Sequence, residues 1–163
     1  MKYMRIGAGG SKVTSKKAAG IFFTDGQKVL MLKRREEDNG TWALPGGKAK
    51  SGESQIGAAI RETKEETGLD AIPGYRFEDF TSSTGRKKFT CYMYRVDKPF
   101  DVDISDEHTA WEWMDLDSLE AEDLHPKFRE NLPRYLKSIR NKVRTFSEWS
   151  EIHFLIENIT PKH

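Results

Sequence analysis

The segment that decides the fold is residues 47–69, GKAKSGESQIGAAIRETKEETGL. It carries Arg61 and three closely spaced glutamates, Glu62, Glu65 and Glu66. Residues three and four apart lie on the same side of an α-helix, so these glutamates line one edge of a predicted helix. Like charges at this spacing destabilise an isolated helix by about 0.2–0.5 kcal/mol per pair. The helix is therefore either a solvated acidic face or one side of a divalent-metal site.

Glycines flank the predicted helix on both sides. Residues 44–47, Leu-Pro-Gly-Gly, are typical of a tight turn, because glycine adopts backbone angles that other residues resist. Gly68 stands where a left-handed residue ends a helix. The acids are thus expected beside an exposed loop backbone, where oxygen-rich sites for hard cations such as Mg²⁺ form. This arrangement favours the metal site over the solvated face.

Residues 47–69 resemble the Nudix box, G-x5-E-x7-R-E-U-x-E-E-x-G-U, in which U is a bulky aliphatic residue. Thr63 departs from it, because it is polar where Ile, Leu or Val is usual. The segments before residue 47 look like the strands that precede the box in MutT-like members, and the resemblance covers residues 17–120. The chain is therefore identified as a member of the Nudix hydrolase family. The positions in register are Gly47, Glu53, Arg61, Glu62, Glu65, Glu66, Gly68 and Leu69.

The carboxylates of Glu62, Glu65 and Glu66 are hard oxygen ligands that suit octahedral Mg²⁺ or Mn²⁺. The resemblance implies that the carbonyl of Gly46 completes the inner shell. It also implies that Arg61 orients a catalytic glutamate through a bidentate pair. Glu53 is then a ligand or a helper for a second ion. The predicted catalytic residues within the box are Arg61, Glu53, Glu65 and Glu66.

A further acid beyond the box serves many family members as general base or metal ligand. Glu107 is the candidate here, because it stands five residues before Glu112 and Trp113, as in the MutT-like branch. A solvated acid in a turn is the alternative. For the neighbouring His108, a base, a substrate contact and a residue without a role all stay open.

Candidate substrate contacts lie outside the acidic helix. Trp42 offers an aromatic face for stacking a base, although core packing is the default for any tryptophan. Arg34 follows a predicted strand and is placed to meet phosphates, with a plain surface charge as the alternative. Lys48, next to the box glycine, is the third predicted substrate contact.

The expected architecture is α/β. The resemblance implies a Nudix-type α/β/α sandwich with a mixed sheet, the box as a loop–helix–loop on one flank, and extra C-terminal helices. Asp25-Gly26 separates two strand-like runs and is a hairpin signal. The box helix is expected over residues 54–67, with Ser54 as N-cap and Ile56, Ala59 and Ile60 toward the core. The predicted strands are residues 18–24, 28–34, 74–80, 89–96 and 110–114.

The C-terminal part is predicted to be helical. Residues 126–141 carry apolar side chains at helical spacing, and Pro133 is expected to break or kink this helix. A capping box opens a second helix over residues 145–158, which packs on the domain or forms a homodimer surface. The expected organisation is a flexible tail at 1–16, a Nudix core at 17–120 and a helical extension at 121–163, packed on the core or in a dimer interface.

Composition and net charge indicate the environment in which the protein is expected. The chain has 163 residues and a net charge of +1, so no overall field favours nucleic acid or a membrane. Its only cysteine, Cys91, sits in an apolar run and is expected to be a small core residue. No apolar stretch approaches the roughly 20 residues of a membrane span. A soluble, cytoplasmic protein is therefore expected.

Elimination leads to the substrate. The proline that marks ADP-ribose members would fall at Thr84, and the tyrosine of diadenosine polyphosphate members at residues 85–87, and neither is present. The sequence thus predicts a Mg²⁺-dependent pyrophosphohydrolase of nucleoside diphosphate-linked compounds, with (d)NTPs or oxidised nucleotides as leading substrates. The alternatives are an RNA 5′-end pyrophosphohydrolase, which would contact nucleic acid, and a non-catalytic nucleotide-binding module.

Overall fold

The computed structural model describes residues 16–73, 75–81 and 87–141. Its centre is a seven-stranded sheet in the order β3-β2-β1-β6-β5, with β4 on β1 and β7 on β2. All of the predicted strands are present, with bounds that differ by a few residues. The strands are β1 (Lys16–Thr24), β2 (Lys28–Arg34), β3 (Trp42–Ala43), β4 (Gly46–Lys48), β5 (Tyr75–Thr81), β6 (Lys87–Arg95) and β7 (His108–Asp115).

The sheet is mixed, as predicted. β1 runs parallel to β6, whereas the other pairs are antiparallel. The hairpin between β1 and β2 forms at Asp25-Gly26, where Asp25 Oδ1 accepts hydrogen bonds from the backbone N–H groups of Gln27 and Lys28. β1 and β2 pair at Thr24↔Val29, beside the turn. Further along, β4 pairs with β1 over residues 18–20.

β4 corrects one prediction. Residues 44–47 were expected to form a tight turn, but Gly46 and Gly47 belong to a short strand that pairs with Gly20 and Ala19 of β1. The free backbone of β1 supplies the partners that make this glycine segment extended.

The box helix is α2 (Gln55–Thr67), and it begins and ends where the capping residues Ser54 and Gly68 predicted. The side chain of Ser54 accepts a hydrogen bond from the N–H of Gly57, and Gly68 ends the helix with a φ of 75°. The predicted apolar stripe is partly wrong, because Ile56 is 37% exposed. The residues of α2 that are buried are Ala58, Ala59, Thr63, Glu66 and Thr67.

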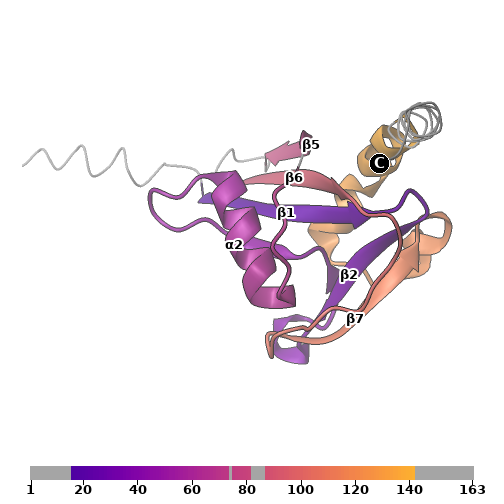
Figure 1. The fold of residues 1–163 in the computed structure, drawn as a ribbon, viewed down its shortest axis with the longest axis horizontal. Coiled ribbons are helices and arrows are strands. Elements are labelled where there is room, and N and C mark those ends of the chain that lie inside the picture. The colour runs from indigo at the N-terminus through magenta and orange to yellow at the C-terminus, as the bar shows by residue number, and fades with distance from the viewer. Residues whose placement is uncertain (1–15, 74, 82–86, 142–163) are drawn as a thin grey trace, which may run out of the picture.

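Two helices cover opposite faces of the sheet, so the α/β/α sandwich is confirmed (Figure 1). On β1, Ile21 and Phe23 belong to the core cluster that includes Ala59 of α2. The intervening Phe22 belongs to the other cluster, with Phe128 from the helix of residues 126–141. This alternation is that of a strand buried on both faces.

The helix of residues 126–141 is continuous through Pro133, so the predicted break does not occur. Pro133 is exposed, while one side of the helix is buried in the core. This packing offsets the hydrogen bond that proline cannot donate. The predicted helix at 145–158 and residues 1–15 of the predicted tail lie outside the described residues, whereas Lys16, the last residue of that tail, begins β1. The buried side chains of the described helix are Phe128, Asn131, Leu132, Tyr135 and Ile139.

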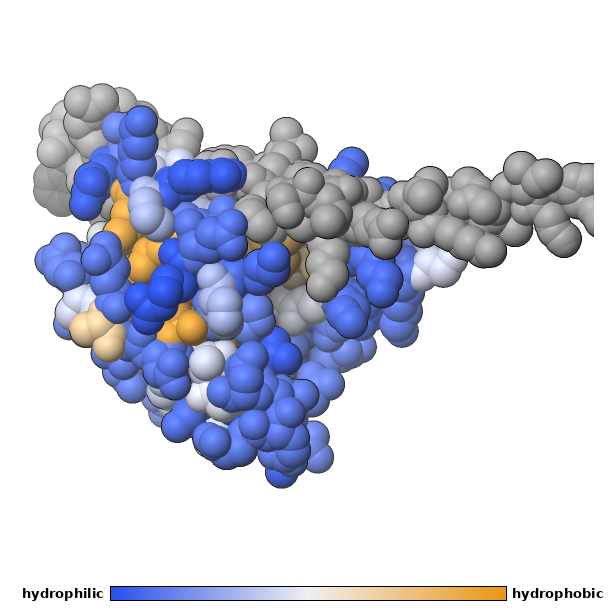
Figure 2. Space-filling view, turned by 180° about the vertical axis from the view of Figure 1, so that it is seen from behind, coloured by the Kyte–Doolittle hydropathy of each residue, from blue (hydrophilic) through white to orange (hydrophobic). Residues whose placement is uncertain are grey.

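Two short 3₁₀ helices complete the described chain, η1 (Glu36–Asp38) and η2 (Leu116–Ala121). Cys91 is buried in the core, as predicted. Seen from behind Figure 1, the described surface is mostly hydrophilic, with one small apolar area between hydrophilic side chains (Figure 2). Within the described residues, no helix has the length and apolar character to cross a membrane.

Candidate active site

The glycine segment before the box holds two acids of α2 in place. The N–H of Gly46 donates a 2.9 Å hydrogen bond to Glu66 Oε1. At Gly47, an added Cβ atom would lie 2.4 Å from Glu62 Oε2, so a larger residue would displace this carboxylate from its present position. The pairing of β4 with β1 fixes both glycines. The backbone of β4 therefore forms one wall of an acidic site.

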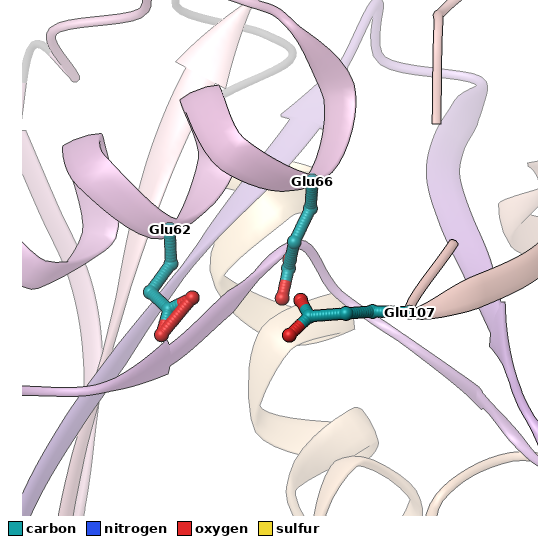
Figure 3. Close-up of side chains that lie close together, drawn as sticks. All are labelled: Glu62, Glu66 and Glu107. Carbon is teal, nitrogen blue, oxygen red and sulfur yellow. The ribbon is translucent and has the colours of Figure 1, made fainter. Parts of the chain in front are cut away.

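Three carboxylates meet at this wall, those of Glu62, Glu66 and Glu107 (Figure 3). One oxygen from each lies within 4.8 Å of the others. Glu62 and Glu66 come from α2, and Glu107 comes from the segment immediately before β7. We call these three residues the carboxylate cluster. Hard oxygen donors converging in this way are the ligand set of Mg²⁺, Mn²⁺ or Ca²⁺, so the cluster fits a divalent cation.

The electrostatics of the cluster agree with a cation site. Burial raises the pKa of Glu66 to about 8, assisted by the negative charges of Glu62, Glu107 and Glu65 and opposed by the hydrogen bond from Gly46. Burial also raises the pKa of Glu62, although the charge of Arg61 opposes the shift. Acids whose ionised forms are unfavourable by themselves are stabilised by a bound cation.

Arg61 sits beside the cluster and clamps Glu53. Its Nε and Nη2 atoms donate to the two carboxylate oxygens of Glu53 at 2.9 and 3.0 Å, and Nη2 also donates to the carbonyl of Lys48 at 3.1 Å. The bonds from Arg61 to Glu53, with one from the N–H of Lys50, lower the pKa of Glu53 to about 2. The predicted bidentate pair therefore exists, and it joins Arg61 to Glu53.

Glu65 is not a member of the carboxylate cluster. Its side chain is 53% exposed and accepts hydrogen bonds from Arg61 Nη1 at 3.3 and 3.4 Å. One residue before Glu66, it projects about 100° away around the helix, toward Arg61. At Gly46, the N–H donates a hydrogen bond to Glu66 of the cluster. The roles of Glu65 and of the Gly46 carbonyl as metal ligands stay predictions.

The three predicted substrate contacts lie on separate elements. Arg34 ends β2, and its Nε donates to the carbonyl of Asp38 at 3.1 Å. Trp42 is half-buried on β3 and packs against the core. Lys48 is exposed at the end of β4. Their binding roles stay predictions.

His108, on β7, has a buried Nδ1 atom for which the described residues supply no hydrogen-bond partner. Burial lowers the pKa of His108, and the nearby charge of Arg34 lowers it further.

Sequence reasoning missed the contacts that bring Glu107 to the cluster. The N–H of Ser105 donates to the carbonyl of Glu66 at 3.0 Å, and Arg35 Nη1 donates to the carbonyl of Asp106 at 2.8 Å. The second contact joins residues 71 positions apart. No local signal in the sequence indicates either bond, since both depend on the tertiary fold.

Known proteins with a similar sequence or fold show the family of this chain. A model of the NUDIX domain family matches residues 14–135. The chain is 28% identical to the MutT protein of Methanosarcina mazei Go1, whose crystal structure superposes with a TM-score of 0.62 over 75% of this chain and 93% of that one. An Ap4A hydrolase from C. elegans, solved as a binary complex, shares the fold at 24% identity and a TM-score of 0.61, covering 77% of this chain and 98% of that one.

Among curated proteins, the chain is 37% identical over 83 residues to the asymmetrical bis(5′-nucleosyl)-tetraphosphatase of Sus scrofa, a match that covers 47% of this chain. The chain spans about half the length of that relative, 56%. The chain belongs to the NUDIX domain family, so the family identified from the box residues is confirmed.

Proposed function

We propose that this protein is a divalent-metal-dependent hydrolase that cleaves a phosphoanhydride bond in nucleoside diphosphate derivatives. The observation that carries the proposal is the carboxylate cluster of Glu62, Glu66 and Glu107 against the backbone of β4. Its family supports the same class of reaction. Water would attack a phosphorus atom, the bridging P–O bond would break, and a phosphorylated leaving group would depart.

Mg²⁺ or Mn²⁺ is the proposed cofactor. Glu62, Glu66 and Glu107 would hold it, with Glu65 and the Gly46 carbonyl as further candidate ligands. When bound, such an ion neutralises phosphate charge and lowers the pKa of a coordinated water. The buried Glu66 suits this ion because its raised pKa returns toward the ordinary range when positive charge is nearby.

Arg61 and Glu53 have a supporting role in this proposal. The low pKa of Glu53, about 2, makes it a weak base and a permanent partner for Arg61. The guanidinium is thereby held 3.6 Å from Glu62 Oε2 and within hydrogen-bond distance of Glu65. Glu65 is exposed beside it and is the candidate general base, whereas Glu107 is assigned to the metal ion.

The proposed substrates are (d)NTPs or oxidised nucleotides, which would give a nucleoside monophosphate and pyrophosphate. Dinucleoside polyphosphates are a second candidate, favoured by the name of the Sus scrofa relative. The absence of tyrosine at residues 85–87 weighs against them. Arg34, Trp42 and Lys48 are the proposed contacts to phosphate and base.

A Mg²⁺-dependent hydrolysis panel with product identification tests the proposal. It includes (d)NTPs, 8-oxo-dGTP, ADP-ribose, NADH, dinucleoside polyphosphates and triphosphate-ended RNA. Release of pyrophosphate from one (d)NTP supports the leading substrate, and cleavage of a dinucleoside polyphosphate supports the second. A preference for RNA indicates the 5′-end hydrolase. No turnover of any compound, with Mn²⁺ binding intact, contradicts the proposed hydrolase and leaves the binding module.

Glu66→Gln tests the cluster itself. Glutamine keeps the size of the side chain and can still accept the hydrogen bond from Gly46, but it removes a charged ligand. We expect turnover of the substrate found in the panel to fall by at least about 100-fold, with an unchanged circular dichroism spectrum. Asp70→Asn is the control, because Asp70 is exposed and pairs with Lys64 outside the cluster. Full activity of Glu66→Gln would contradict the proposed metal site.

A further inference from the structure

Glu107 reaches the carboxylate cluster from an exposed loop, whereas Glu62 and Glu66 are fixed by α2. The loop is attached to the end of α2, where the N–H of Ser105 donates to the carbonyl of Glu66 at 3.0 Å and that of Asp103 to the carbonyl of Thr67 at 3.4 Å. These bonds fix the loop before the turn that carries Glu107. On its other side, Glu107 is followed by β7, whose first residue His108 pairs with Arg34 of β2. Between these two fixed points, the orientation of Glu107 depends on what holds the turn.

The turn is weakly closed by its own hydrogen bonds. The N–H of His108 donates to the carbonyl of Ser105 at 3.2 Å, and the N–H of Glu107 donates to Ser105 Oγ at 3.4 Å. Both are longer than the usual 2.9–3.0 Å, so they hold the peptide between Asp106 and Glu107 loosely. The carbonyl of Asp106 accepts a shorter bond, 2.8 Å, from Arg35 Nη1.

Arg35 is itself well placed to hold this carbonyl. Its own carbonyl accepts hydrogen bonds from the N–H groups of Asp38 and Gly40, both at 2.9 Å, which fixes its backbone at the start of η1. Its Nε donates to Glu37 Oε2 at 3.3 Å. Because the guanidinium is planar, orienting it with one donor also orients the others.

We propose that Arg35 is a positioning residue for the active site: by holding the carbonyl of Asp106, it keeps the carboxylate of Glu107 beside Glu62 and Glu66. Arg35 does not touch the metal or the substrate in this arrangement and acts through Glu107. The inference rests on the proposed function, since it requires that the carboxylate cluster bind a divalent ion.

Mn²⁺ binding without substrate tests the inference, with free Mn²⁺ measured by electron paramagnetic resonance. Arg35→Met keeps the aliphatic length and removes the donors. Outer-shell partners of metal ligands typically contribute 10–100-fold in affinity, and for this exposed bond we expect about a 10-fold loss. Glu107→Gln should weaken binding at least as much. In the Arg35→Met/Glu107→Gln double variant, the loss should match that of Glu107→Gln alone, because residues that act through one another are not additive.

Arg129→Met is the matched control. Arg129 is also exposed and donates to backbone carbonyls, those of Glu120 and Glu122, at the start of the helix of residues 126–141. It should bind Mn²⁺ like the wild type. Wild-type affinity for Mn²⁺ in Arg35→Met, or additive losses of affinity in the double variant, would overturn the proposed role of Arg35 and leave the proposed function standing. A wild-type protein that does not bind Mn²⁺ would overturn the proposed function, and this inference with it.

Discussion

Glu66 shows how one side chain links the site to the stability of the protein. Its carboxylate is buried and accepts a hydrogen bond from Gly46, yet burial and neighbouring acids raise its pKa to about 8. The unfolded chain would ionise this group at an ordinary pKa near 4.5. Between these two values the folded protein binds the proton and the unfolded chain does not. The contribution of Glu66 to stability is therefore present below the lower pKa and is lost as the pH rises through the higher one.

A prediction on pH dependence follows for the metal-free protein. Raising the pH from about 6 to about 9 should lower the free energy of unfolding by on the order of 2 kcal/mol through Glu66. Glu66→Gln should lack this part of the pH dependence, because glutamine does not titrate. Urea denaturation of both proteins in chelator at the two pH values measures the difference. Parallel pH profiles for the two proteins would contradict the raised pKa.

Thr63 is the position where the box departs from its pattern, and the structure shows the consequence. The side chain is fully buried, and its Oγ1 atom has no hydrogen-bond partner among the described residues. Thr63→Val replaces the hydroxyl with a methyl group of similar size, so we expect the free energy of unfolding to rise by about 1 kcal/mol. Denaturation by urea, followed by circular dichroism, measures it.

Thr67 offers the matched control for Thr63. It is also buried, but its hydroxyl donates to the carbonyl of Thr63 at 2.7 Å and accepts from the N–H of Leu69 at 3.2 Å. Thr67→Val should therefore destabilise the protein. Equal effects of the two substitutions would show that the hydrogen bonds do not decide the outcome.

Single residues also mark how far the sequence predicts the site. The spacing of the box acids follows from the helix, so the meeting of Glu62 and Glu66 was predictable. Glu107 was foreseen from its distance to Glu112, although the contacts of Ser105 and Asp106 that place it are tertiary. The exclusion of Glu65 from the cluster was not foreseen, although its place one residue before Glu66 turns it about 100° around α2, toward Arg61.

At the scale of elements, α2 was predicted to within a residue because its ends are set locally. Ser54 caps the first turn and Gly68 adopts the left-handed conformation that ends the last one. Elements whose conformation depends on distant partners were predicted less well. The segment at Gly46 and Gly47 is a strand because β1 pairs with it, and the helix continues through Pro133 because its other side is buried.

The cap of α2 gives a prediction at this scale. Ser54→Ala removes the acceptor for the N–H of Gly57 and should destabilise the protein by about 1 kcal/mol. Glu62 and Glu66 lie one turn or more beyond the first turn of α2. Fraying of that first turn should therefore leave their positions largely unchanged. Urea denaturation measures the effect.

Ser51 provides the control for the cap, since it is exposed in the loop before α2. Ser51→Ala should change the free energy of unfolding by less than about 0.5 kcal/mol. An equal loss in both variants would mean that the cap does not stabilise the helix.

At the scale of the whole molecule, the helix of residues 126–141 belongs to the core that supports the sheet. Leu132 is 1% exposed in the cluster that contains Phe22 and Met31. Leu132→Ala should lower the free energy of unfolding by about 2–5 kcal/mol, because it leaves a cavity between helix and sheet. Chemical denaturation measures the loss.

Leu136 lies on the same helix but is only partly buried against the cluster. Leu136→Ala should therefore destabilise the protein less than Leu132→Ala. If neither substitution has an effect, the helix does not stabilise the sheet.

The parallel pairing of β1 with β6 has a consequence for the order of folding. The register runs from Lys16↔Lys87 to Thr24↔Arg95, so every pair joins residues about 70 positions apart. α2 and β4 lie within the loop that this pairing closes, and Glu107 lies beyond it. Closing such a loop costs conformational entropy before the stabilising contacts between the strands have formed. The pairing of β1 with β6 is therefore a slow step in folding. Glu62, Glu66 and Glu107 therefore come together late, and a partly folded chain lacks the assembled carboxylate cluster.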